Sequence, residues 1–378
     1  MKKLGFIIFF DAFAMMLLGT IIVLSASSTY SEFKFDSLFR LSNSHLGKVL
    51  LGLIFMVIFS AIPYEYYKKI SKQAALGVVV MLVLTLIFAP SIKGAGRWIN
   101  LGVTSFQPAD VAKLILIIHL AYLLEEKNDL LKDFRNGFRY LLLWVITISV
   151  LILVQPNISN GVLLLVTCLV MMYVGGAKFI HILYTSIICF LGGACAALLF
   201  SHSHSRITTF ISHLSNGHDI NIQVKQSILG LGSGGLLGVG IGHSMQSNLF
   251  LPEAYGDFIF AIYGEETGFI GSVLLLFCFI LLFIAGLLIA KKTKDKFGQL
   301  LAFGIIFSIV IYALVNIAVS IGILPTTGLP LPFISYGGTS LIFLCISTGI
   351  LINIALTNAK KDQVVLNVNT RKTSEVKL

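Results

Sequence analysis

Long apolar stretches recur along almost the whole chain, and they constrain its fold more than any other feature. Hydrophobic residues make up 57% of the 378 residues and charged residues only 12%, whereas a soluble domain carries about 25% charged residues. A stretch of roughly 20 apolar residues can cross a bilayer as a helix, which makes every backbone hydrogen bond within the segment. The sequence therefore predicts an all-α polytopic membrane protein.

We expect ten transmembrane helices, with a large extracytoplasmic loop between the seventh and the eighth. The predicted spans are residues 4–24, 47–62, 74–88, 111–124, 140–154, 161–174, 179–200, 269–290, 300–321 and 339–356. Several are shorter than the usual length of roughly 17–25 residues, so their ends are approximate. Segment 111–124 is the weakest of them, and three alternatives stay open for it: tilted, re-entrant, or buried among other helices.

Positive side chains gather on one side of the predicted helices. With the N-terminus inside, 19 of the 27 Lys and Arg residues fall in inside segments and seven in outside segments. Cytoplasmic loops carry this excess in membrane proteins, so we expect both termini in the cytoplasm. Residues 1–356 then form one membrane domain, and 357–378 form a basic cytoplasmic tail that we expect to be disordered. The net charge of +10 reflects this topology rather than a nucleic-acid partner.

Three of the predicted outside loops are more elaborate than simple connectors. They are residues 90–110, 201–257 and 328–338. Long loops with many Gly and Pro residues tend to be functional, and because all three face the same side we expect them to form one site. The second loop ends with Glu253 and Asp257, which run into apolar sequence. A charge at a membrane boundary is costly and points to function.

The second loop also contains the glycine-rich run GLGSGGLLGVGIG (residues 230–242). Gly230, Gly232 and Gly235 have the spacing GxGxxG, but a dinucleotide site also needs a strand–turn–helix unit, and none is indicated. We instead expect the glycines to permit close helix packing or turns with positive φ.

Several motifs follow one another in a recognisable order. They are SAS (25–27), GAGRWINLG (94–102), FQPADVAKL (106–114), QPNISNG (155–161), SRITTF (205–210), GLGSGG (230–235), LPEAYGDFIFAIYGEETGFIG (251–271) and LPLPFISYGG (329–338). With these motifs the chain resembles the SEDS family (shape, elongation, division and sporulation), the FtsW, RodA and SpoVE type of integral membrane protein. The PEA and GEE elements are more similar to the division and sporulation branch.

The resemblance implies a peptidoglycan glycosyltransferase that polymerises lipid II, a disaccharide-pentapeptide on undecaprenyl pyrophosphate, outside the bacterial cytoplasmic membrane. The implied partners are a class B penicillin-binding protein and other membrane proteins of division or elongation. The functional acid of the family falls on Asp257, as a general base toward a sugar hydroxyl; such help is worth about 10²–10⁴-fold. Judged from the residues alone, Asp257 capping the following helix is the stronger interpretation.

Cationic side chains near the loops are candidates to hold the departing pyrophosphate. Arg97, Lys113 and Arg206 fit this role, because Arg contacts phosphate with two donors and Lys acts as a point charge. The alternatives are snorkelling at the interface for the two arginines, and pairing with Asp110 for the lysine. Trp98 is either an interfacial anchor or a surface on which sugar or lipid stacks.

Other polar residues of the loops have both a functional and a structural interpretation. Glu253 shares its loop with the proposed base and is a candidate to bind substrate. Ser335 and Tyr336 either form hydrogen bonds with substrate or mark a break in a helix. Glu265 and Glu266 are expected to begin the next helix, where negative charge meets the positive helix end.

The sequence predicts no firmly bound cofactor or metal. The histidines of the second loop match no zinc spacing, and the open alternative is a loosely held divalent cation, Mg or Mn, on Asp257 or Glu253. Two other function classes stay open. Asp11 and Lys113 fit the polar path of a lipid II flippase, although no inverted repeat supports it. A non-catalytic scaffold for a penicillin-binding protein is the other, because Tyr255 stands where the family commonly has His.

Overall fold

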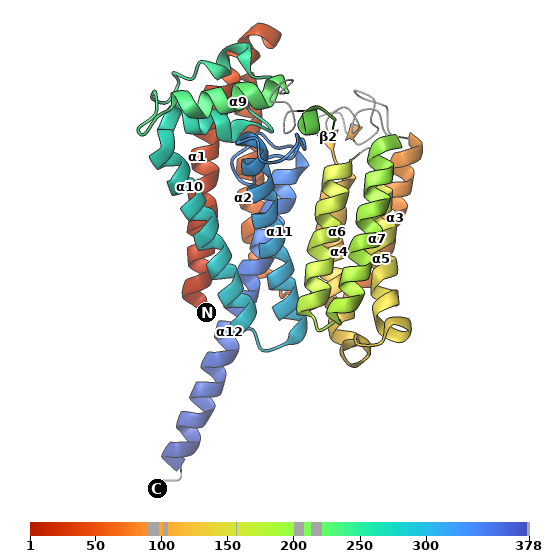
Figure 1. Cartoon of the computed structure of the whole chain (residues 1–378). Coiled ribbons are helices and arrows are strands. Elements are labelled where there is room, and N and C mark those ends of the chain that lie inside the picture. The colour runs from red at the N-terminus through yellow and green to blue at the C-terminus, as the bar shows by residue number, and fades with distance from the viewer. Residues whose placement is uncertain (89–97, 101–104, 156, 200–207, 213–220, 376–378) are drawn as a thin grey trace.

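The computed structural model describes residues 1–88, 98–100, 105–155, 157–199, 208–212 and 221–375 of the chain (Figure 1). Within these residues the fold is helical, apart from one antiparallel pair of two-residue strands, β1 (Ile99–Asn100) and β2 (Ser105–Phe106). The longer helices are α1 (Lys2–Phe35), α2 (Arg40–Ala61), α3 (Glu65–Phe88), α4 (Pro108–Glu126), α5 (Arg139–Val154), α6 (Ile158–Val174), α7 (Phe179–Leu199), α9 (Ile222–Ser233), α10 (Ile259–Lys292), α11 (Lys296–Ser320) and α12 (Thr339–Glu375). Three single turns, η1 (Asn128–Leu130), η2 (Phe134–Phe138) and η3 (Gln246–Phe250), connect them.

The lengths of these helices confirm a polytopic membrane protein. Among the described residues, seven helices are long and apolar enough to cross a bilayer: those within α1, α2, α3, α10, α11 and α12, and the segment Phe134–Val154 that includes α5. The apolar helices α6 and α7 are shorter by this measure. Segment 111–124 lies in α4, most of whose residues are buried against α3, α5, α6 and α11. Of the three alternatives for this segment, burial among other helices is the one observed, and the total of ten crossings stays a prediction.

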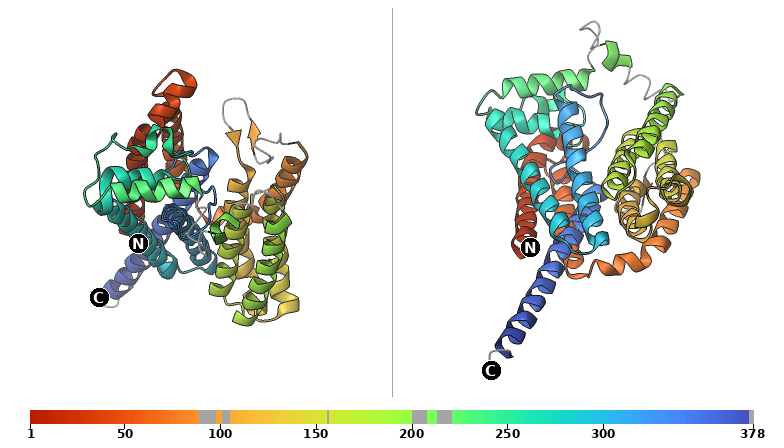
Figure 2. Two further views of the ribbon diagram at one scale, coloured as in Figure 1. Left: turned by 45° about the horizontal axis from the view of Figure 1, so that its top comes forward. Right: turned by 60° about the horizontal axis from the view of Figure 1, so that its bottom comes forward.

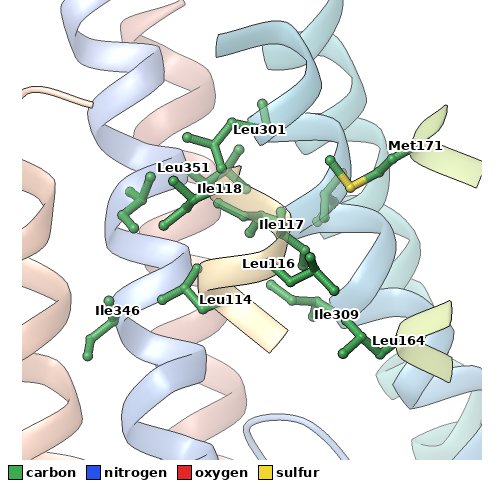
Figure 3. Packing of buried hydrophobic residues seen from close by; sticks show 14 of the residues in the cluster. Leu114, Leu116, Ile117, Ile118, Leu164, Met171, Leu301, Ile309, Ile346 and Leu351 are labelled. Carbon is green, nitrogen blue, oxygen red and sulfur yellow. The ribbon is translucent and has the colours of Figure 1, made fainter. Parts of the chain in front are cut away.

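The helices form two groups that meet along one seam. Helices α1, α2, α10, α11 and α12 pack together, and α3 to α7 form the second group (Figure 2). The groups meet where α11 packs against α4 and α6 and where α12 packs against α4. Figure 3 shows the buried side chains of this seam. They include Leu114, Leu116, Ile117 and Ile118 of α4, Leu164 and Met171 of α6, Leu301 and Ile309 of α11, and Ile346 and Leu351 of α12.

Because lipid tails are as apolar as these side chains, the seam is held by close packing rather than by expulsion of water.

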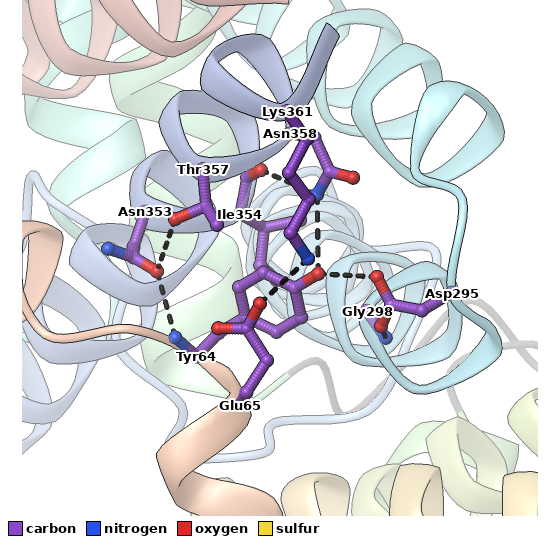
Figure 4. A network of polar contacts seen from close by, with 9 residues as sticks. All are labelled: Tyr64, Glu65, Asp295, Gly298, Asn353, Ile354, Thr357, Asn358 and Lys361. Atoms are coloured by element: carbon purple, nitrogen blue, oxygen red, sulfur yellow. Dashed lines mark hydrogen bonds and ion pairs between the residues drawn. The ribbon is translucent and has the colours of Figure 1, made fainter. Parts of the chain in front are cut away.

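A polar network ties three helix ends together at the end of the bundle that carries the chain termini (Figure 4). Tyr64, in the turn between α2 and α3, donates its hydroxyl hydrogen to Asp295, which precedes α11. The Tyr64 backbone N–H donates to the side-chain oxygen of Asn353 in α12 at 2.9 Å. Burial and the neighbouring Asp295 carboxylate raise the pKa of Tyr64. Glu65 and Lys361 add an ion pair at 2.9 Å, so α12 is fixed to the turn before α3.

Helix α12 does not end where the apolar span ends. It continues as a helix to Glu375, past the expected start of a disordered tail at residue 357. The expectation of disorder is therefore wrong for the described part of this segment. The contact of Lys361 with Glu65 anchors the first turn beyond the span.

Helix α10 is broken at Gly268, where φ is 69° and ψ is −166°. The break leaves N–H and C=O groups without their helical partners, and the glycine-rich segment 234–242 pairs with them. The bonds run from Phe269 N–H to Gly235 O (2.9 Å), Ile270 N–H to Leu236 O (3.2 Å), Val239 N–H to Glu265 O (3.0 Å) and Gly240 N–H to Glu266 O (3.0 Å). The glycine-rich segment is thus a backbone clamp around a broken helix, since buried backbone groups need partners.

Two buried carboxylates hold the other end of the same segment. The Glu265 carboxylate accepts from the N–H groups of Met245 (3.1 Å) and Gln246 (3.3 Å) and from the hydroxyls of Ser233 (3.2 Å) and Ser244. The Glu266 carboxylate accepts from Gly242 N–H (3.0 Å) and from the Ser25 hydroxyl of α1. The expectation that these glutamates begin the helix is wrong, because α10 begins at Ile259. Their role is to bind a loop.

The glycines confirm the expected turns with positive φ. Gly235, Gly238, Gly240 and Gly242 have φ values of 53°, 83°, 99° and 84°. Gly230 and Gly232 lie within α9, so the GxGxxG spacing forms no strand–turn–helix unit here. This agrees with the expectation that the run is not a dinucleotide-binding loop.

We predict that Gly238→Ala unfolds this clamp. A Cβ atom on Gly238 would lie 2.1 Å from the carbonyl oxygen of Glu266, and the backbone there is left-handed. The free energy of unfolding should fall by about 2–4 kcal/mol, measured as a lower melting temperature of the full chain in detergent. Gly232→Ala is the matched control, because its Cβ would meet nothing within 4 Å. Equal melting temperatures for the two variants would contradict the clamp.

Candidate functional site

A cavity of about 200 Å³ lies at the end of the bundle opposite the chain termini. Its walls come from α4, α11, α12, the turn before α10 and the loop 328–338. The charged side chains that line it are Asp110, Lys113 and Asp257, and the polar ones include Gln107, Asn157, Asn160, Ser308, Tyr312, Ser335 and Tyr336. A cavity with apolar walls and a few convergent polar groups is the usual form of a small-molecule site.

Asp257 reaches the cavity from the turn between η3 and α10. Phe258, not Asp257, holds the N-cap position of α10, and its side chain makes no capping hydrogen bond. The interpretation of Asp257 as a helix cap is therefore not the observed one. Its carboxylate is half-buried and lines the cavity, which is the position that a group acting on substrate needs.

The backbone of this turn is held by Asn316 of α11. The Asn316 side-chain amide donates to the carbonyl oxygen of Asp257 at 2.8 Å and to that of Leu329 at 2.7 Å. Asn316 is buried, with 1% of its surface exposed; its bond to Leu329 is shielded from water and its bond to Asp257 partly so. One carboxamide thus fixes the turn that carries Asp257 to the loop on the other side of the cavity.

Two further bonds join the same turn to the loop 328–338. The Ser335 hydroxyl donates to the carbonyl oxygen of Gly256 at 2.7 Å and accepts from Leu331 N–H at 2.7 Å. The backbone N–H of Tyr336 donates to the carbonyl oxygen of Tyr255 at 2.9 Å. Because the Ser335 hydroxyl proton is used within the protein, Ser335 shapes the cavity, and direct contact of Ser335 with substrate stays a prediction.

Lys113 enters the cavity from α4. Its ammonium group lies 4.3 Å from the centre of the Tyr312 ring, a distance that allows a cation–π interaction. Tyr312 in turn donates to Asn160 at 2.9 Å, and Asn160 donates to Asn157 at 3.0 Å. These hydrogen-bonded side chains extend the cavity wall from α11 to α6.

Asp110 lies one turn before Lys113, but it bonds to a different helix. Its carboxylate accepts from the Thr339 hydroxyl at 3.1 Å, and that hydroxyl accepts from Gln107 N–H at 3.1 Å. The ion pairs that the described residues form include Lys68 with Glu125 and Lys361 with Glu65, but not Asp110 with Lys113. The charges of Asp110 and Lys113 still act on each other, and Lys113 also lines the cavity, where an anionic ligand can reach it.

The structure brings together most of the residues that the sequence proposed for substrate binding. Trp98, Lys113, Asp257, Ser335 and Tyr336 all line this one cavity, although they come from four separate segments.

The other three candidates do not line it. Glu253 is exposed on the turn before α10, with a φ of 58°, and is not among the lining residues. Arg97 and Arg206 lie outside the described residues.

The most important residue that sequence reasoning missed is Asn316. A signal for it exists, because an amide within the apolar span 300–321 is costly unless it has partners. Lys48 of α2 was also missed. Its ammonium donates to the Tyr336 hydroxyl at 3.0 Å, and only the fold shows that α2 borders the loop 328–338.

The part of the chain that the structure describes contains no group of three or more His, Cys, Asp or Glu side chains placed to hold a metal ion. Asp257 and Glu253 therefore belong to no such group among the described residues, and a loosely held divalent cation on either of them stays a prediction.

The chain is similar to known proteins over most of its length. Residues 6–360 match the family model FTSW_RODA_SPOVE, described as cell cycle protein. The chain is 40% identical over 345 residues to the probable peptidoglycan glycosyltransferase FtsW of Geobacter sp. (strain M18), covering 89% of this chain and 92% of that protein. It is 35% identical over 345 residues to stage V sporulation protein E of Bacillus subtilis (strain 168), covering 90% and 94%.

Solved structures show the same architecture. The rod shape determining protein RodA of Thermus thermophilus superposes with a TM-score of 0.67 at 25% identity, over 92% of this chain and 95% of that one. A chain from a peptidoglycan synthase complex that coordinates polymerization and crosslinking superposes with a TM-score of 0.75 at 22% identity, over 93% and 97%. At that identity the second match supports the fold alone.

We predict that Asn316→Ala loosens the turn that carries Asp257. Two buried carbonyl groups lose their donor, and an unsatisfied buried group costs about 1–3 kcal/mol. Thermal unfolding should shift to lower temperature, and amide hydrogen exchange should rise in residues 251–258 and 329–336. The control is Asn248→Ala, whose side chain accepts one exposed hydrogen bond from Thr29 at 3.1 Å. Unchanged exchange in both segments would show that Asn316 does not fix the turn.

Proposed function

Because this chain belongs to the FtsW, RodA and SpoVE family of cell cycle proteins, we propose that it is a peptidoglycan glycosyltransferase that polymerises lipid II into glycan strands at the outer face of the bacterial cytoplasmic membrane. The observation that carries the proposal is the cavity in which the Asp257 carboxylate and the Lys113 ammonium face the same space. The names of the related FtsW proteins give the reaction class, and lipid II is the substrate that the family resemblance implies.

The proposed reaction joins two lipid-linked sugars. A hydroxyl oxygen of one sugar forms a bond to the anomeric carbon of the other, while the bond from that carbon to the lipid diphosphate breaks. Asp257 takes the proton of the attacking hydroxyl, as a general base. The electron pair of the broken bond leaves with the diphosphate, and Lys113 stabilises the negative charge there in a cavity shielded from water. Trp98 offers an aromatic face to sugar or lipid.

The same proposal fixes an orientation in the membrane. We place the cavity outside and both chain termini in the cytoplasm, with residues 1–356 as the membrane domain and 357–378 as the basic cytoplasmic segment. Two observations support this. The termini lie at the end of the bundle opposite the cavity (Figure 1), and the sequence assigns 19 of the 27 Lys and Arg residues to the segments expected on the side of the termini, in keeping with the positive-inside bias.

The proposed partner is a class B penicillin-binding protein, which crosslinks the glycan, together with other membrane proteins of division or elongation. The structural relative from a peptidoglycan synthase complex supports a fold that works within such an assembly. The similarity to FtsW and to stage V sporulation protein E favours the division and sporulation branch.

We predict that Asp257→Asn abolishes polymerisation of purified lipid II. The amide keeps the shape but cannot accept the proton, so the rate of glycan formation should fall by about 10²–10⁴-fold, measured on gels of labelled glycan. Asp36→Asn is the matched control. Asp36 ends α1 in a left-handed conformation with a φ of 51°, which Asn adopts readily, so this variant should polymerise like the wild type.

Three outcomes of that assay would each contradict the proposal in a different way. Long glycan from Asp257→Asn would exclude the carboxylate as the base. Movement of lipid II across vesicles without polymer, in the wild type, would indicate a flippase. Retained binding of the penicillin-binding partner with neither activity would indicate a scaffold.

We predict that Lys113→Met lowers the rate of glycan formation by about 100-fold, because a group that stabilises charge in the transition state is lost. Met keeps most of the length of the lysine side chain, so it can still pack against Tyr312. The control is Lys225→Met, which removes an exposed charge on α9 outside the cavity. Equal rates for both variants would remove Lys113 from the site.

A further inference from the structure

Tyr336 connects the cavity to helix α2, which itself contributes no residue to the lining. The Tyr336 hydroxyl accepts from the Lys48 ammonium at 3.0 Å and lies 3.3 Å from the Ser44 hydroxyl. The same ammonium lies 4.2 Å from the centre of the Tyr336 ring. Two residues of one turn of α2 thus hold a single side chain of the cavity wall.

The aromatic ring itself has little freedom to move. The backbone N–H of Tyr336 donates to Tyr255 O at 2.9 Å. The two rings meet edge to face, with their centres 5.7 Å apart and their planes at 87°. The centre of the His45 ring lies 5.8 Å from that of Tyr336. Because Tyr255 is two residues before Asp257, the position of the Tyr336 hydroxyl is fixed relative to the proposed base.

The Tyr336 hydroxyl can both accept and donate hydrogen bonds. A tyrosine hydroxyl has two lone pairs and one proton. Lys48 donates to one lone pair; when Ser44, whose contact can run in either direction, donates to the other, the proton remains for a third partner. A positive donor on the oxygen also polarises the O–H bond and makes it a stronger donor. Burial alone raises the pKa of Tyr336, but the bonds from Ser44 and Lys48 and the charge of Lys48 together bring it below its ordinary value.

We propose that Lys48 is a positioning residue of the site, which holds and polarises the Tyr336 hydroxyl so that it donates a hydrogen bond to an anionic oxygen of the lipid diphosphate in the cavity. The inference rests on the proposed function and deepens it. Lys113 then meets the diphosphate from α4, and Tyr336 meets it from the opposite loop. Lys48 touches no substrate and acts only through the tyrosine.

A double-mutant cycle on the full chain tests this inference. We expect Lys48→Met and Tyr336→Phe each to lower kcat for lipid II polymerisation about tenfold. The double variant should be no slower than either single variant, because both remove the same hydrogen bond to substrate. Lys48→Arg should recover most of the rate, since it restores a positive donor. The control is Lys34→Met, whose ammonium donates to Tyr30 at 3.1 Å, a tyrosine that does not line the cavity.

A binding measurement separates this inference from the proposed function. Affinity for undecaprenyl pyrophosphate in micelles, followed by the thermal shift of the purified full chain, needs no turnover. We expect about tenfold weaker binding for Lys48→Met and Tyr336→Phe, and unchanged binding for Lys34→Met. Additive losses in the double variant, failure of Lys48→Arg to recover, or equal affinity of Lys48→Met and wild type would each overturn the role of Lys48. A wild type that binds the lipid but forms no glycan would overturn the proposed function instead.

Discussion

The two hydrogen bonds donated by the Asn316 carboxamide are the interaction on which the rest of the site depends. They join the turn that carries Asp257 to the loop that carries Ser335 and Tyr336, and neither segment is part of a helix that would hold it otherwise. Irregular backbone at the end of a membrane bundle needs every polar group paired, because an unpaired buried carbonyl is costly. A single amide on the rigid helix α11 meets this need for two segments at once.

The need to pair buried backbone groups also explains the glycine-rich segment beside the broken helix α10. A break in a membrane helix leaves backbone N–H and C=O groups without their helical partners. Here the glycine-rich segment, which precedes α10 in the chain, supplies those partners. The carboxylates of Glu265 and Glu266 then bind the N–H groups at the end of that loop. Glycines with positive φ and buried acids are often taken as marks of a ligand site, but here Glu265 and Glu266 accept hydrogen bonds from the loop that carries these glycines, although the second oxygen of Glu266 is buried without a partner among the described residues. The functional carboxylate is the one that faces the cavity.

Sequence patterns predicted the helices and the grouping of the loops well, because apolar length depends on local composition. They placed Trp98, Lys113 and Asp257 in one site, and the cavity confirms that these residues lie together. They did not predict the partners of Glu265 and Glu266, the helical continuation of α12, or the roles of Asn316 and Lys48. Each of these depends on contacts between residues distant in the chain. Such contacts are fixed by tertiary packing, which local composition does not encode.

The seam between the two groups of helices has a consequence for how the cavity responds to its surroundings. Its walls include α4 from one group and α11 and α12 from the other, so neither group encloses it alone. A partner that changed the angle between the two groups would therefore widen or narrow the cavity without disturbing the packing inside either group.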